Sequence, residues 1–102
     1  IINSYKYLCE EKHEYILSKQ LLRSGTSIGA NVKEAIRGQS KDDFIHKLNI
    51  SLKEASESEY WIELLFETDY ITKQQFDSLI GDCRELIKLL TSIIKTSRKE
   101  GK

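Results

Sequence analysis

The sequence predicts an all-α protein, an antiparallel up-down-up-down four-helix bundle that forms a single domain over residues 1–102. Proline is absent, glycine occurs five times, and no Asn-Gly or Asp-Gly dipeptide separates alternating apolar residues, so hairpin turns have no signal. Apolar residues recur instead at intervals of three and four, which places them on one face of a helix.

The first expected element is the end of a helix over residues 1–9, where Ile2, Tyr5 and Leu8 share one side. The sequence begins at Ile1 rather than at methionine. We therefore expect this helix to be truncated at its N-terminus.

A second helix is predicted over residues 11–37, and a run of small residues occupies its middle at 24–30. A glycine inside a helix costs about 1 kcal/mol relative to alanine, but the apolar rhythm continues through the run without a slip. We expect the small residues to let a neighbouring backbone approach closely, opposite a thin stripe on the third helix. The residues assigned to close helix packing or to contacts between copies are Gly25, Gly29, Ser51, Ala55, Ser58, Tyr60 and Trp61.

A capping sequence marks the start of the third helix. The Ser40 hydroxyl can accept from free backbone amides, and Asp42 and Asp43 suit the positive end of the helix dipole. The helix is expected to end near Thr68.

Thr72 and Gln75 form a second capping box, so the fourth helix begins there and extends to about residue 99, with Gly101 placed to end it. The expected connections, at 10–11, 38–40 and 68–72, are short. Neighbouring helices must therefore run antiparallel.

The three long helices carry more apolar residues than the core of one bundle needs. Large exposed apolar patches usually mark an interface, so the residues themselves predict a homo-oligomer. The residues outside the expected helix seams include Leu22, Ile36, Phe44, Trp61, Leu64, Leu65, Leu79, Leu86, Leu89 and Ile93.

The chain resembles a known family in three segments: LLRSGTSIGANVKEA at 21–35, DFIHKL at 43–48 and ESEYWI at 57–62. The family is that of the bacterial four-helix bundle proteins encoded by intervening sequences within 23S ribosomal RNA genes. This sequence departs from the usual pattern at Lys33, where alanine is common, and at Ser58, where threonine is common.

The resemblance implies a ring-like homopentamer without enzymatic activity. It also extends to the accessory proteins of diversity-generating retroelements, which assemble as pentameric barrels and engage nucleic acid and a reverse transcriptase. A role linked to nucleic acid follows only by analogy.

A polar stripe is predicted where the second and third helices meet. Polar groups near a core need partners, so we expect these residues to pair with one another and to fix the helix register. An anion site at Arg23 is the alternative. The members are Arg23, Ser27, Asn31, Glu34, Glu54 and Glu57.

Basic residues gather in the fourth helix and are the candidates for a nucleic-acid surface, because copies in a ring would join them into a collar. A solvated helix end is the alternative, since cations in a last turn suit the helix dipole. The residues are Lys88, Lys95, Arg98, Lys99 and Lys102.

The adjacent aromatic residues Tyr60 and Trp61 could stack on nucleobases. Their neighbours Glu57, Glu59 and Glu63 would repel phosphate, so packing at a helix or subunit contact is the expected role.

No catalytic, metal-binding or cofactor-binding residues are predicted. His13 and His46 lack other good ligands at helical spacing, and Cys9 and Cys83 stand alone in apolar surroundings, where small buried side chains are expected. No nucleophile has a base at a fixed helical spacing, so the protein is expected not to be an enzyme.

The charge balance and the hydropathy limit the kinds of partner that are expected for this protein. Sixteen basic and sixteen acidic residues give a formal net charge of zero, which argues against coating nucleic acid or membrane by bulk electrostatics. No apolar stretch approaches the roughly 20 residues of a membrane span, so a cytoplasmic protein without a membrane partner is expected.

Two functions stay open from the sequence. The first is an oligomeric scaffold or accessory protein that associates with RNA, with DNA or with a protein that processes them, through basic residues of the second and fourth helices. The second is a structural homo-oligomeric module that binds a protein partner and has no nucleic-acid role.

Overall fold

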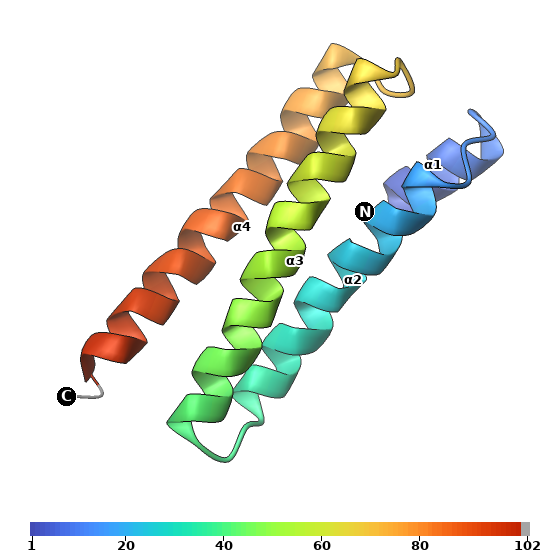
Figure 1. Ribbon diagram of the computed structural model, residues 1–102. Helices are drawn as coiled ribbons and strands as arrows, with labels where there is room; N and C mark the ends of the chain where they lie inside the picture. Colours follow the sequence, from blue (N-terminus) through green and yellow to red (C-terminus); the bar gives the residue numbers. More distant parts are fainter. Residues whose placement is uncertain (101–102) are drawn as a thin grey trace.

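The computed structural model describes residues 1–100 and contains four helices: α1 (Ile2–Glu10), α2 (Leu17–Ile36), α3 (Lys41–Glu67) and α4 (Lys73–Glu100). Consecutive helices run antiparallel, α3 lies between α2 and α4, and the short α1 lies beside the first turns of α2 (Figure 1). No strand occurs among the described residues. The predicted all-α, up-down-up-down four-helix architecture is confirmed.

The caps predicted for α3 and α4 are present. The Asp43 amide donates to the Ser40 hydroxyl at 3.1 Å. At α4 the Gln75 amide donates to Thr72 Oγ1 at 3.1 Å, and the Thr72 amide donates to Gln75 Oε1 at 2.8 Å. Both helices therefore begin where their capping sequences place them, and α3 ends next to Thr68.

The start of α2 differs from the sequence prediction, which began this helix at residue 11. The helix begins at Leu17, because the carboxylate of Glu14 accepts from the first free amides, those of Ile16, Leu17 and Ser18. His13 has a φ of 54°, a left-handed conformation that interrupts a right-handed helix. Residues 11–16 therefore form a connection, and Glu14 is only 6% exposed within it.

Two apolar clusters fill the bundle, one at each end. The first joins α1, α2, α3 and α4 through the buried residues Leu8, Leu21, Ile62, Leu65, Ile71, Ile80 and Cys83. The second joins α2, α3 and α4 through Ile28, Ala35, Leu48, Ala55, Leu90 and Ile94.

The apolar excess predicted from the sequence is smaller in the structure. Leu65 is fully buried, because it lies three residues after Ile62 on the face that packs against the first cluster. Trp61, Leu79 and several others pack partly buried against the clusters. Among the large apolar residues assigned outside the seams, Ile36 and Leu89 are exposed by more than half, at 73% and 56%.

None of the helices described over residues 1–100 combines the length and the apolar character that crossing a membrane requires.

Candidate functional site

The polar stripe ties α2 to α3. Arg23 Nη1 lies 3.2 Å from Glu54 Oε2, and Arg23 Nη2 forms a second ion pair with Glu57. Glu57 also accepts from the Trp61 indole N–H at 3.2 Å. Arg23 is thus flanked by two carboxylates, which neutralise the charge that an anion would need.

The rest of the stripe is also paired within the chain. The Asn31 side-chain amide donates to the Ser27 carbonyl at 2.9 Å and to the Ser27 hydroxyl at 3.2 Å. Glu34 forms an ion pair with Lys47 of α3 at 2.9 Å. The six stripe residues therefore have structural partners, and α2 and α3 are held in one register.

Small residues bring α2 and α3 together at serines. The hydroxyls of Ser24 and Ser58 lie 2.8 Å apart, and Ser51 Oγ donates to the Ile28 carbonyl at 3.0 Å. Ser24, Ser51, Ala55 and Ser58 are each at most 1% exposed. The close approach predicted for this run is therefore found, with Ser24 as its α2 member.

The two glycines of the run have other surroundings. A Cβ at Gly25 would collide with the side chain of Ile1, so this glycine admits the N-terminal residue beside α2. Gly29 has no heavy atom within 4 Å of the position its Cβ would take. Within one chain Gly29 is exposed and packs against no neighbouring helix, so a contact with another copy is the part of its predicted role that stays a prediction.

Tyr60 and Trp61 lie on α3 in an edge-to-face arrangement, with ring centroids 5.0 Å apart and an interplanar angle of 65°. Trp61 packs partly buried against the first cluster, while Tyr60 is 56% exposed. The tryptophan serves the fold, and the tyrosine presents its ring to solvent.

The cysteines occupy different environments. Cys83 is buried, and its thiol donates to the Ala55 carbonyl at 3.2 Å. Burial, together with the negative charge of Glu59, raises the pKa of this thiol to about 11. Cys9 is only partly buried. Across the described part of the chain, no group of three or more His, Cys, Asp or Glu residues could hold a metal ion.

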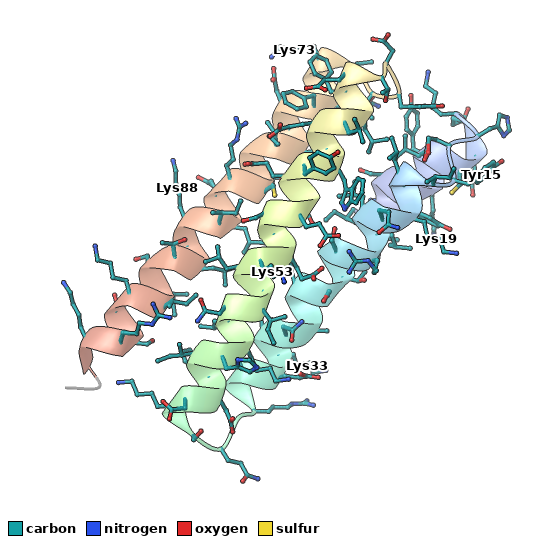
Figure 2. All side chains as sticks on the ribbon, viewed as in Figure 1. Tyr15, Lys19, Lys33, Lys53, Lys73 and Lys88 are labelled. Atoms are coloured by element: carbon teal, nitrogen blue, oxygen red, sulfur yellow. The ribbon has the colours of Figure 1, made fainter. Side chains whose placement is uncertain are left out.

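The antiparallel arrangement separates charge along the bundle. The C-terminal part of α2, the first half of α3 and the last half of α4 share one end of the molecule, together with the α2–α3 turn (Figure 1). We call residues 29–53 and 88–99 the basic half, because they hold nine basic and three acidic residues. Residues 1–28 and 54–87 form the acidic half, with six basic and twelve acidic residues. Lys33 projects near the first end and Tyr15 near the other (Figure 2).

Most cations of the basic half form no ion pair with a described carboxylate. Lys47 pairs with Glu34, and the other eight basic residues form no ion pair within 4.0 Å among the described residues. In the acidic half, three of the six basic residues, Arg23, Lys73 and Arg84, are paired with carboxylates, and the other three, Lys6, Lys12 and Lys19, form no ion pair among the described residues. The eight unpaired cations are Lys33, Arg37, Lys41, Lys53, Lys88, Lys95, Arg98 and Lys99.

Three of the predicted nucleic-acid candidates meet at one groove. Lys95, Arg98 and Lys99 line a depression of about 350 Å³ between α3 and α4, and Asn49 and Leu52 of α3 form its other wall. Lys88 lines a separate depression on α4 next to Leu89, and Lys102 lies outside the described residues.

Comparisons with known proteins agree with this fold. Residues 1–92 match the family described as the 23S rRNA-intervening sequence protein. The chain belongs to this family. The resemblance noted in the sequence is thereby confirmed.

A solved structure of the family lies very close to this one. It is a protein of unknown function from the S23 ribosomal protein family of Bacteroides thetaiotaomicron VPI-5482, with 60% sequence identity and a TM-score of 0.91. The match covers 92% of this chain and 84% of that one. No curated protein matches the chain.

The sequence predicted only some of the residues that form the basic half. The prediction named the cations of α4 one by one and those of α2 only as a group, and it missed those of the turn and of α3, as well as Asn49 in the groove wall. A signal was available, because no acidic residue occurs at 44–53 or at 86–99. Antiparallel neighbours bring these two segments to the same end of the molecule.

Proposed function

We propose that this protein is a non-enzymatic accessory protein that binds nucleic acid through its basic half. One observation carries the proposal: eight cations share one half of the bundle without ion-pair partners among the described residues. Phosphate backbones are bound by such cations, which release condensed counterions as they bind.

The zero net charge does not oppose this proposal. Opposite charges that lie at opposite ends of a molecule about 50 Å long act separately on a partner. The distance far exceeds the screening length of about 8 Å at physiological ionic strength. A polyanion at the basic half is therefore little affected by the acidic half, which favours binding in one orientation.

The test is a binding titration by fluorescence anisotropy with a labelled 23S rRNA fragment at several salt concentrations. Three or four neutralised phosphates give a slope of log affinity against log salt near −3, by the rule of about −0.7 to −0.9 per phosphate. Changing Arg98→Glu and Lys99→Glu together should lower the affinity at least tenfold.

A matched control carries the same change of net charge in the acidic half. Lys12→Glu with Lys19→Glu should leave the affinity within about twofold, because these residues lie in the other half of the molecule. No binding at low salt, or an equal loss in both double variants, would refute the proposal.

The second part of the proposal is that the protein associates with copies of itself. Self-association is also expected for the alternative function, a structural module that binds a protein partner. Leu89 is 56% exposed on α4 and Ile36 is 73% exposed at the end of α2, so two faces of the bundle offer apolar contacts. The number of copies, five, is an expectation from the family resemblance. Light scattering after size exclusion should show an oligomer that Leu89→Glu weakens, and a monomer at micromolar concentration would exclude it.

A further inference from the structure

The groove between α3 and α4 is more than a cationic surface. Its rim carries Lys95, Arg98 and Lys99, which recur at intervals of three and four and so lie on one face of α4. Its depth is apolar, since Leu52 is half-buried and Ile94 is 4% exposed. A volume of about 350 Å³ lies at the lower end of the 300–1,000 Å³ typical of small-molecule pockets.

The charge around the groove has one sign over a long stretch of both helices. The acidic residues nearest in sequence are Asp43 and Glu54 on α3, and Glu85 on the described side chains of α4. None of them forms an ion pair with the three rim cations. The rim therefore offers three positive charges to a ligand with several negative ones.

The polar side chains of the groove wall donate hydrogen bonds to backbone carbonyls of their own helices. Their oxygen atoms therefore remain available as acceptors. Asn49 donates its amide N–H to the Ile45 carbonyl at 3.1 Å, so its Oδ1 oxygen remains an acceptor. Thr91 donates its hydroxyl to the Ile87 carbonyl at 2.7 Å, so its oxygen also can only accept. The groove thus combines cations outside, apolar side chains inside and acceptors on the wall.

We infer that this groove holds an unpaired nucleotide of a single RNA strand. The phosphates lie on Lys95, Arg98 and Lys99, the base covers Leu52 and Ile94, and an exocyclic amino group of the base donates to Asn49 Oδ1. A paired base keeps its faces stacked and its amino group bonded to its partner strand, so a duplex could use the cations only. The inference rests on the proposed function and names the form of nucleic acid that the basic half selects.

The test compares an unstructured 12-nucleotide RNA with a 12-base-pair RNA duplex at one salt concentration, using the full chain. The single strand should bind about threefold to tenfold more tightly, since only an unpaired base can cover the apolar side chains of the groove. Thr91→Leu should fill part of the groove without changing the charge or adding an aromatic ring, and should reduce this preference while duplex affinity stays the same. The control is Thr96→Leu, an exposed α4 position outside the groove.

A second variant tests the acceptor. Asn49→Ala should weaken oligo-A and oligo-C by about threefold to tenfold and weaken oligo-U less, because uracil has no exocyclic amino group and offers only its ring N3–H. AMP alone should bind at least about a hundredfold more weakly than the strand, because it lacks neighbouring phosphates. AMP that binds as tightly as the strand would overturn the assignment of a strand.

The outcomes separate the inference from the proposed function. Equal affinity for strand and duplex, with both lowered by Arg98→Glu and Lys99→Glu, overturns the nucleotide groove and leaves binding by the basic half intact. A lack of binding to either RNA overturns both.

Discussion

The acidic and basic halves of the bundle use their charged side chains in opposite ways. In the acidic half Arg23 bridges two carboxylates, Arg84 contacts Glu59 and Glu63, and Lys73 pairs with a carboxylate one turn away. In the basic half eight of nine cations have no ion-pair partner among the described residues. Three of the six cations of the acidic half are thus paired within the chain, against one of the nine in the basic half.

This difference has an energetic side. Like charges gathered at one end repel one another and destabilise the compact state. The acidic half carries an excess of six negative charges, and the basic half an excess of six positive charges. A polyanion would relieve this repulsion on binding. Substitutions in the acidic half should therefore change stability, and substitutions in the basic half should change binding.

The largest effect is expected from Ser58→Leu in the acidic half. Ser58 is 1% exposed and its hydroxyl bonds to Ser24, so a larger side chain would force α2 and α3 apart. The free energy of unfolding should fall by about 2–3 kcal/mol in urea denaturation. Thr96→Leu, at an exposed position in the basic half, should change it by less than about 0.5 kcal/mol. Similar values for the two variants would contradict the comparison.

The next effect in size is expected from Glu14→Ala. This carboxylate accepts from the amides of Ile16, Leu17 and Ser18, so its removal leaves the start of α2 uncapped. Loss of a cap costs about 1–2 kcal/mol, which thermal or urea unfolding would detect. Glu11→Ala is the control, because Glu11 is exposed and its side chain makes no bond in the structure. Equal stability of the two variants would remove the capping role of Glu14.

The Glu14 cap also shows where sequence reasoning succeeds and where it fails. Ser40 and Thr72 are residue types strongly preferred at helix starts, and both starts were predicted correctly. Glu14 is not such a residue, and it caps from three residues before the helix, so the apolar rhythm alone extended α2 too far. Only the folded connection, with His13 in a left-handed conformation, reveals the break.

The candidate site was foreseen less completely than the fold. Spacing placed Arg23 on a polar face of α2 and made Glu54 and Glu57 a comparable pair on α3, and the structure joins the two by ion pairs within one chain. Spacing could not distinguish Ser24 from Gly29, because the face of α2 that meets α3 depends on how the helices rotate about their axes. The groove between α3 and α4 depends on the same rotation, so its Asn49 wall was not predicted.

Two arginines test the comparison directly. Arg23→Ala should lower stability by about 1 kcal/mol, because it leaves Glu54 and Glu57 beside each other without a cation. It should leave RNA affinity unchanged. Arg98→Ala should do the reverse, with unfolding shifted by less than about 0.5 kcal/mol and RNA binding weakened. Urea unfolding and fluorescence anisotropy should be measured on both variants. If either variant loses both stability and RNA affinity, the two halves do not have separate roles.

The smallest effect is expected at Cys83, a buried polar group of the acidic half. Its thiol pKa is raised to about 11 in the folded protein, mainly by burial, whereas an unperturbed thiol has a pKa near 9.0. Between these values the unfolded chain has released the proton and the folded chain still holds it, so stability falls as pH rises through that window. Below pH 9 both states keep the proton and the effect disappears. Cys83→Ala should be less stable than the native chain at pH 8, and the gap should narrow at pH 9.5 by no more than about 1 kcal/mol. A gap that stays constant between the two pH values would mean that water reaches this thiol and that the fold does not enclose it.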